Sequence, residues 1–210
     1  MGRPASAPHR DVDIAPLAPG DQAKAADVIT RAFLDDPLVS FALRRHRAEA
    51  MRLLFGALSR DVMRHGGGWG ARHAGELVGV SLWLPPGHAP VTLLRHLRSL
   101  PDWLRLARLD PSGLLRTMRN GEALDGLHPP EPHWFLSLLA VDTDRRGQGI
   151  GRGLVAPGLD VAREARLPVH LDTSRPQNVR IYERLGFEVT GEVQPLPGGP
   201  TAWGMTARPH

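Results

Sequence analysis

A glycine-rich turn is the first feature of the sequence that could bind a ligand. It lies within VDTDRRGQGIGRGLV, residues 141–155, between an apolar strand pattern and a helical pattern. Glycines allow such a turn to direct several backbone N–H groups into one concavity, at the positive end of the helix dipole. The turn therefore favours a phosphate or pyrophosphate, although glycine turns also form without any ligand.

The only tyrosine of the chain is the second feature. Tyr182 lies within NVRIYERLGF, residues 178–187, a short helical pattern that ends in Gly-Phe. Its ring can pack at the edge of a core with the hydroxyl in water, although Ile181 and Leu185 already supply an apolar face. Whether the phenol does chemistry depends on the elements around it.

The glycine turn and Tyr182 belong to a chain whose predicted helices and strands follow a mixed α/β order. Helical spacing predicts helices around residues 25–33 and 51–62, through segment 90–127, after the glycine turn and around Tyr182. Alternation and apolar runs predict strands at 11–17, 69–73, 77–84, 133–141, 168–172, 187–193 and 201–207. Residues 1–10 are expected to form a disordered tail and residues 11–210 a single domain.

Composition excludes several classes of function. Without cysteine there are no disulfides, thiolate metal sites or cysteine nucleophiles, which suits a reducing cytoplasm. No apolar run approaches the roughly 20 residues of a membrane helix. Lys24 is the only lysine among 26 basic residues, and the net charge is only +4. The arginines of residues 91–120 alternate with leucines, which indicates a solvated helix face rather than a nucleic-acid surface.

One alternative ligand for the turn is a dinucleotide. Residues 151–156, GRGLVA, fit the fingerprint G-x-G-x-x-A, and Asp172 follows about 20 residues later. Three features count against it. The first glycine follows the strand only after nine residues, Pro157-Gly158 should interrupt the next helix, and too little chain follows Asp172 for a doubly wound sheet. A Walker-type loop is excluded because no Gly-Lys-Ser/Thr is present.

The combined pattern resembles the GNAT acetyltransferase superfamily. The signature R/Q-x-x-G-x-G/A after a buried strand occurs here as RGQGIG, residues 146–151, and the strand–Pro-Gly-Asp–helix opening and YERLGF fit the same superfamily. Within it, residues 131–208 are most similar to puromycin N-acetyltransferase and its relatives, through EPHWFL, LDTS, NVRIYERLGFEVT and a closing W-x-M-T. The resemblance implies an α/β (α+β) fold: a mixed, mostly antiparallel central sheet with a parallel, splayed strand pair, flanked by helices.

The resemblance also implies acetyl-CoA as cosubstrate. The splayed pair would be residues 134–141 and 168–172, with the pantetheine arm bound to the main chain of Leu139 and Val141. The pyrophosphate would be held by Arg146 and by the backbone N–H groups of Gly147, Gln148, Gly149, Ile150 and Gly151. Many family members carry a cofactor-contacting asparagine seven residues before the tyrosine, and Arg175 occupies that position here. Asn178 is therefore a candidate contact, and its alternative role is to cap the start of the helix.

Tyr182 matches the family tyrosine near the thioester sulfur, so the resemblance implies a catalytic role. Attack by an amine expels a thiolate, and a phenol with a pKa of about 10 can protonate a thiolate whose acid resembles cysteine, about 8.5. The general base is open among water and the side chains of Asp35, Asp36, Glu131, His133 and Asp172. The histidines show no metal-ligand spacing, so no metal is expected.

The sequence thus predicts an N-acetyltransferase that moves an acetyl group directly from acetyl-CoA to a primary amine of a small molecule, such as an aminonucleoside or another antibiotic. Residues 90–127 would line the acceptor pocket. Two alternatives are a non-catalytic acyl-CoA-binding regulatory module and a protein N-acetyltransferase that docks its substrate on the arginine-rich segment. No nucleic-acid or membrane partner is expected, and a homodimer is left open.

Overall fold

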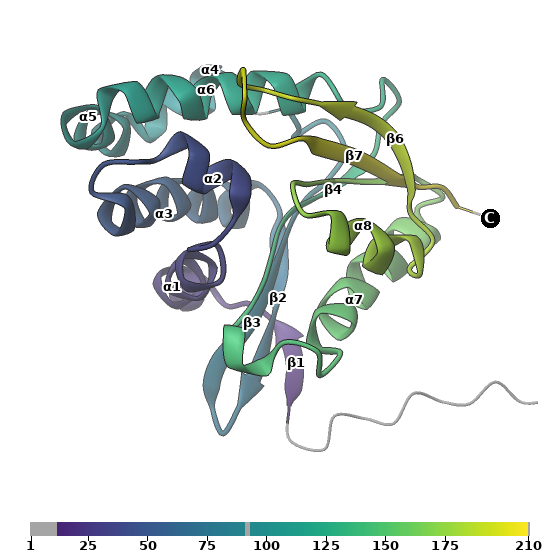
Figure 1. Cartoon of the computed structure of the whole chain (residues 1–210). Coiled ribbons are helices and arrows are strands. Elements are labelled where there is room, and N and C mark those ends of the chain that lie inside the picture. The colour runs from purple at the N-terminus through teal and green to yellow at the C-terminus, as the bar shows by residue number, and fades with distance from the viewer. Residues whose placement is uncertain (1–11, 91–92, 210) are drawn as a thin grey trace, which may run out of the picture.

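A seven-stranded sheet forms the centre of the computed structural model, which describes residues 12–90 and 93–209 (Figure 1). The strand order is β1-β2-β3-β4-β5-β7-β6, and only β4 and β5 run parallel. The strands are β1 (Asp13–Pro16), β2 (Gly67–His73), β3 (Glu76–Leu84), β4 (Trp134–Val141), β5 (Val169–Thr173), β6 (Glu188–Val193) and β7 (Ala202–Ala207). The predicted fold class is confirmed, while the expected tail, 1–10, lies outside the described residues.

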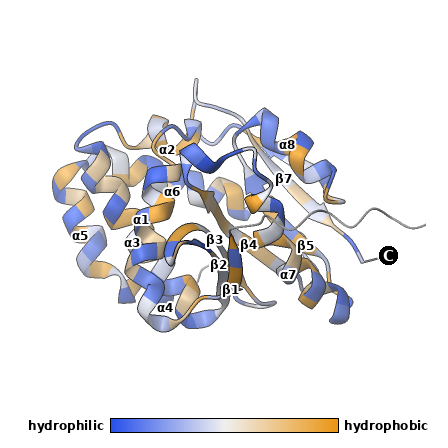
Figure 2. Ribbon diagram, turned by 90° about the horizontal axis from the view of Figure 1, so that it is seen from below, coloured by the Kyte–Doolittle hydropathy of each residue, from blue (hydrophilic) through white to orange (hydrophobic). Residues whose placement is uncertain are grey.

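Helices cover both faces of this sheet (Figure 1, Figure 2). One face carries α1 (Gln22–Ala32), α2 (Pro37–Ala42), α3 (Arg47–His65), α4 (Leu93–Arg98), α5 (Leu100–Leu109) and α6 (Pro111–Asp125). The other face carries α7 (Ile150–Glu164) and α8 (Pro176–Glu183). Short 3-10 turns, η1 (Pro19–Asp21) and η2 (Thr143–Arg145), precede α1 and α7. The helices thus form two layers with the sheet between them.

Each face of the sheet has its own apolar core, because successive side chains of a strand point to opposite faces. Leu82 and Leu84 of β3 pack with the buried residues of α1 and α3. Trp83, between them, packs with Leu136, Leu171 and the buried residues of α7 and α8. The central strands are buried on both sides, which explains why they are apolar runs rather than alternating patterns.

Helix α7 differs from the sequence expectation that Pro157-Gly158 interrupts it. The helix continues from Ile150 to Glu164 with Pro157 inside. A proline there removes one backbone hydrogen bond, but Gly158 lets the helix lie directly against Trp83. A Cβ at Gly158 would come within 2.3 Å of that ring. The expectation was wrong because this packing outweighs the local cost. The mostly antiparallel sheet nevertheless excludes the doubly wound dinucleotide fold.

The arginine-rich segment 90–127 is largely helical where it is described, as expected. Its prolines begin helices instead of ending them: Pro101 lies in the first turn of α5, and Pro111 is the first residue of α6. At these positions the missing N–H has no partner to lose. Because α5 packs against α3 and α6 against α2, the segment covers the same face of the sheet as α1.

Candidate active site

The parallel strands β4 and β5 separate along their length. Residues Trp134 to Leu136 pair with Val169 to Leu171, and the parallel register ends there. Beyond this point β4 continues to Val141 along β3, and β5 continues to Thr173 along β7. The edge of β4 that faces β5 is therefore open from residue 137 onward, and its backbone groups need another partner. Both expected main-chain contacts, Leu139 and Val141, lie in this open part.

The glycine turn begins α7 at the same end of the two strands. Gly147 and Gly149 have φ values of +79° and +78°, in the left-handed region that side chains with a Cβ disfavour. Gly149 is the N-cap residue of α7, and no side chain caps the helix start. Ile150 is buried and anchors the first turn, whereas Gln148 is exposed. The free N–H groups of this turn form the kind of site that binds phosphate.

The first turn of α7 also lies directly over the open part of β4. A Cβ at Gly151 would come 3.9 Å from the side chains of both Leu139 and Val141. The structure therefore brings together the turn and the strand end that the sequence singled out separately.

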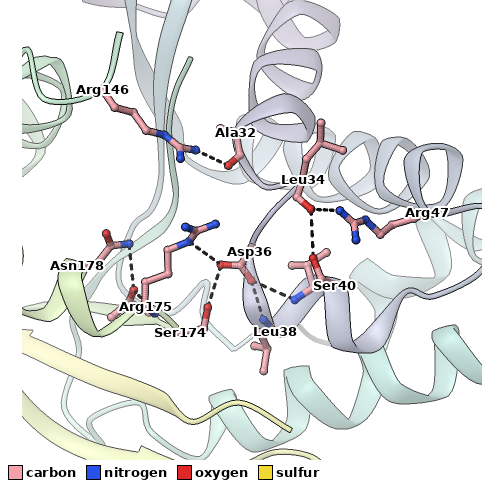
Figure 3. A network of polar contacts seen from close by, with 12 residues as sticks. Ala32, Leu34, Asp36, Leu38, Ser40, Arg47, Arg146, Ser174, Arg175 and Asn178 are labelled. Atoms are coloured by element: carbon pink, nitrogen blue, oxygen red, sulfur yellow. Dashed lines mark hydrogen bonds and ion pairs between the residues drawn. The ribbon is translucent and has the colours of Figure 1, made fainter. Parts of the chain in front are cut away.

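Arg146 is held by the end of α1. Its Nη2 donates a hydrogen bond of 2.7 Å to the carbonyl oxygen of Ala32, the last residue of that helix (Figure 3). The carboxylate of the neighbouring Asp142 accepts hydrogen bonds from two nitrogens of Arg31, and Nη2 lies 2.9 Å from Oδ1. These two contacts fasten the glycine turn to α1. Arg146 still brings a positive charge to the turn, although one of its nitrogens already has a partner.

Tyr182 lies beneath the point where β4 and β5 separate. Its side chain is buried and packs in the same cluster as Leu136 and Leu171, the last paired residues of the two strands. Its ring meets Phe187 edge to face, with 5.7 Å between centroids. The hydroxyl forms no hydrogen bond within the described residues. Burial raises the pKa of Tyr182 above its ordinary value of 10.0, so the phenol stays protonated at neutral pH.

A polar network joins the end of β5 to α2 (Figure 3). Asp36 caps α2 through Oδ1, which accepts the N–H groups of Leu38 and Val39. Its Oδ2 accepts the hydroxyl of Ser174 at 2.9 Å, and Nε of Arg175 lies 3.8 Å away. The α1–α2 connection is thereby tied to the start of α8.

Asn178 belongs to the same end of the strand. Its amide nitrogen lies 3.3 Å from the Thr173 hydroxyl and donates to it. Arg175, not Asn178, is the N-cap residue of α8, and no side chain caps that helix start. The alternative role of Asn178 as the helix cap is therefore wrong. The side chain instead fastens α8 to β5 beside the opening between the strands.

Several candidates for the general base already have partners. Both carboxylate oxygens of Asp36 accept hydrogen bonds, as described above. Asp35 is exposed and lies 3.9 Å from Arg47. Glu131 pairs with Arg208, and its own backbone N–H together with Arg208 lowers the pKa of Glu131. Both ring nitrogens of His133 are in hydrogen bonds, one with the carbonyl oxygen of Glu131 and one with the ring of His128.

Asp172 differs from these candidates. It lies just beyond Leu171, the last residue of β5 that pairs with β4, and one of its carboxylate oxygens is buried without a hydrogen bond. Burial raises the pKa of Asp172, and His170 beside it offsets only part of this effect. His128 and His170 were not singled out in the sequence. Their only signal there is residue type, because they lie far apart in the chain.

Among the described residues, no helix is both long enough and apolar enough to cross a bilayer.

Comparison with known proteins identifies a family and several relatives of this chain. The model of the Acetyltransferase (GNAT) family matches residues 31–187. The chain is 27% identical over 175 residues to an uncharacterised N-acetyltransferase of Schizosaccharomyces pombe, a match covering 80% of this chain and 70% of that protein. It is also 36% identical over 89 residues to the mycothiol acetyltransferase of Acidothermus cellulolyticus. That match covers 40% of this chain and only 27% of the other protein.

Solved structures share the fold over nearly the whole chain. A Corynebacterium glutamicum structure, described as histone acetyltransferase HPA2 and related acetyltransferase, has a TM-score of 0.71 at 25% identity, over 95% of this chain and 97% of that one. Arylalkylamine N-acetyltransferase 2 of Aedes aegypti has a TM-score of 0.64 at 15% identity, over 95% and 99% of the two chains. At this lower identity the likeness concerns the fold alone.

Proposed function

The chain belongs to the acetyltransferase (GNAT) family, and on this premise we propose that it moves an acetyl group from acetyl-CoA directly to a primary amine of a small molecule. The observation that carries the proposal is the meeting of three features at one end of the sheet. These are the open edge of β4, the uncapped start of α7 and the buried phenol of Tyr182. A thioester held in the opening, with its diphosphate on the turn, would have its sulfur near that phenol.

The residues fit the parts of acetyl-CoA by their chemistry. The open edge of β4 at Leu139 and Val141 offers backbone groups to the amide groups of the pantetheine arm. The N–H groups of Gly147 to Gly151, with Arg146 beside them, suit the pyrophosphate. Asn178, which donates a hydrogen bond to Thr173 at the other side of the opening, would make a further contact with the arm.

Tyr182 has the proton that the reaction needs. Attack of the amine nitrogen on the thioester carbonyl carbon forms the C–N bond of the amide and breaks the C–S bond. The phenol donates its proton to the departing sulfur and is reprotonated from solvent. The proton lost by the amine passes to water or to Asp172, because the other candidate bases already have partners. No covalent acyl-enzyme is needed, in agreement with the absence of cysteine.

The face of the sheet opposite to Tyr182 is covered by helices, and this favours a small acceptor. Helices α2 and α6 pack together there, and Asp36 ties α2 to Ser174 at the end of β5. A covered approach suits a small amine better than a protein surface, and the similarity of residues 131–208 supports an acceptor of the puromycin type. The names of the relatives differ, since one is called a mycothiol acetyltransferase and another a histone acetyltransferase and related acetyltransferase. A panel of amines is therefore needed to identify the acceptor.

Acetyl-CoA should stabilise the protein against heat, whereas NAD should not. At 100 times its dissociation constant a ligand adds about 2.7 kcal/mol to the free energy of unfolding, or roughly 5–10 °C in Tm for a chain of this size. Differential scanning fluorimetry measures the shift, and CoA release with an amine panel then measures turnover. A shift with NAD and none with acetyl-CoA would contradict the proposal. Acetyl-CoA binding without turnover on any amine would favour the non-catalytic module.

Replacing Gly149 by valine should weaken acetyl-CoA binding by about 10- to 100-fold. The backbone at φ +78° is costly for a β-branched residue, about 1–3 kcal/mol, and the side chain would crowd the approach of the diphosphate. Calorimetric titration with acetyl-CoA measures the affinity.

Gly75→Val is the matched control for this variant. Gly75 has φ +82° in the turn between β2 and β3, with open space around it. This variant carries the same backbone strain away from the glycine turn, so it should lose stability and keep its affinity for acetyl-CoA. Equal affinities of a folded Gly149→Val variant and the wild type would mean that the glycines only shape the turn.

A further inference from the structure

A cluster of histidine and aspartate side chains lies on the face of β5 opposite to Tyr182. Leu171 packs in the cluster of Tyr182, so its neighbours in the strand, His170 and Asp172, point to the other face. There they meet His128, from the connection between α6 and β4. One ligand atom from each of the three residues lies within 4.8 Å of the others. We propose that His128, His170 and Asp172 bind a divalent transition-metal ion, of which Zn²⁺ fits the donor set best.

The spacing of two of these atoms is that of zinc ligands. Nε2 of His170 and Oδ1 of Asp172 are 3.3 Å apart. Both atoms are buried, and neither forms a hydrogen bond. Ligands bound to tetrahedral zinc at about 2.0–2.1 Å are roughly 3.3–3.4 Å from one another. The two atoms face each other as an ion pair only when His170 is protonated. With a neutral imidazole both lack a partner, which is rare for buried polar atoms, and a metal ion would supply one.

Hydrogen bonds orient the two imidazoles for metal binding. Nδ1 of His133 lies 2.8 Å from the carbonyl oxygen of Glu131, which can only accept, so this nitrogen carries the proton. A neutral His133 then accepts at Nε2 from Nδ1 of His128, at 2.9 Å. His128 is left with its lone pair on Nε2. Such outer hydrogen bonds fix the tautomer of metal-binding histidines in other proteins.

His170 has an equivalent outer partner. Its Nδ1 lies 3.1 Å from the hydroxyl of Thr206 on the adjacent strand β7. When Nδ1–H donates to this hydroxyl, Nε2 keeps its lone pair and faces Asp172. Both imidazoles can therefore present Nε2 to one ion while each Nδ1 is satisfied by the protein.

The charge of Asp172 also needs a partner. Burying a carboxylate is costly unless a cation or several hydrogen bonds compensate it. Within the described residues Asp172 forms an ion pair with His170 alone, and that pair exists only when the imidazole is protonated. A second histidine–aspartate group shows the contrast: Asp61 lies 3.9 Å from His65, but Arg95 already pairs with that carboxylate. A divalent ion would supply a permanent positive charge at Asp172. With the ion bound, this carboxylate would no longer act as a base, and the proton lost by the amine would pass to water.

Metal binding requires at most one movement. The three ligand atoms lie within 4.8 Å of one another, and a tetrahedral site needs separations of roughly 3.3–3.4 Å, so any difference would be closed by a shift of His128 towards β5. His128 lies in the connection between two elements, outside any helix or strand, where such a shift is least costly. Three protein ligands leave at least one position for water or for a group of the acceptor, as in zinc sites with an open position.

The test is a titration of tag-free protein, freed of metal by a chelator, with ZnCl₂ at neutral pH. Calorimetry should show one equivalent bound with sub-micromolar affinity, and CoCl₂ should give the visible absorption of a site with nitrogen and oxygen ligands. His128→Gln and Asp172→Asn should each weaken zinc binding by at least about 100-fold, and Thr206→Val by about 10-fold or more.

His88→Gln is the matched control. The ring of His88 lies beside that of His65, tilted, with 5.9 Å between centroids, in the group whose aspartate, Asp61, already pairs with Arg95. Its loss should leave zinc binding unchanged. The inference is overturned if the wild type binds no stoichiometric zinc, or if His128→Gln and Asp172→Asn bind it as tightly as the wild type does. The measurement contains no acetyl-CoA, so its outcome is independent of the proposed acetyl transfer.

Discussion

Replacing Tyr182 by phenylalanine should lower kcat by about 10²–10⁴-fold and leave the affinity for acetyl-CoA nearly unchanged. The substitution removes the proton donor and keeps the ring, which packs edge to face on Phe187. The hydroxyl has no hydrogen-bond partner among the described residues, so the loss of stability should not exceed about 0.5–1.5 kcal/mol. Steady-state kinetics under conditions where the chemical step limits the rate measure the effect.

Two controls separate proton donation from packing. The loss of kcat should shrink with an acyl donor whose leaving thiol has a lower pKa, because that thiolate needs the proton less. Ser59→Ala removes a hydroxyl that is buried without a partner in α3, away from the opening between β4 and β5, and should leave kcat unchanged. A folded Tyr182→Phe variant with near wild-type kcat would show that the tyrosine only packs in the core.

Replacing Asp110 by alanine should reduce the free energy of unfolding by about 3–5 kcal/mol. Asp110 is completely buried at the start of α6. Its carboxylate accepts the backbone N–H groups of Arg44 and Arg45, both at 3.1 Å, and of Gly113 at 2.8 Å. The guanidinium of Arg116 lies 3.5 Å away. Alanine would leave these donors unpaired between α2, α3 and α6, which cover the proposed acceptor side. Urea denaturation measures the change.

The effect of Asp110 should depend on pH in a defined direction. Burial by itself would raise the pKa of Asp110, but the hydrogen bonds from Arg45, Gly113, Arg44 and Ser112 outweigh it and hold the pKa below its ordinary 3.8. A lowered pKa means that the stabilisation is complete above about pH 5 and is lost as the pH falls through the folded-state pKa. The difference between wild type and Asp110→Asn should therefore stay constant near neutrality and shrink below about pH 4.

The exposed pair of Asp160 and Arg163 provides the control. The side chain of Asp160 is 62% exposed, so Asp160→Asn makes the same chemical change in water and should cost no more than about 0.5 kcal/mol. An Asp110→Asn variant as stable as the wild type at neutral pH would contradict the role given to this carboxylate.

Local patterns in the amino-acid sequence are sufficient to locate the main helices and strands and the glycine turn. Helical spacing of the apolar residues placed α1 and α3, and apolar runs placed β3 and β4, because side-chain periodicity is a property of neighbouring residues. The positive φ values of Gly147 and Gly149 also follow from local chemistry, since only glycine takes them readily. The parallel, splayed strand pair and the role of Tyr182 came instead from the resemblance to a family.

The meeting of residues that are distant in the chain depends on the tertiary structure. Pro157 lies inside α7, against the local expectation, because the close packing of Gly158 on Trp83 offsets its cost. The bond between Asp36 and Ser174 and the group of His128, His170 and Asp172 had no sequence signal of spacing. Both depend on where β5 lies beside β4 and on which connections cross its end. Strand pairing joins residues far apart in the chain, so a pattern read within a short window cannot contain them.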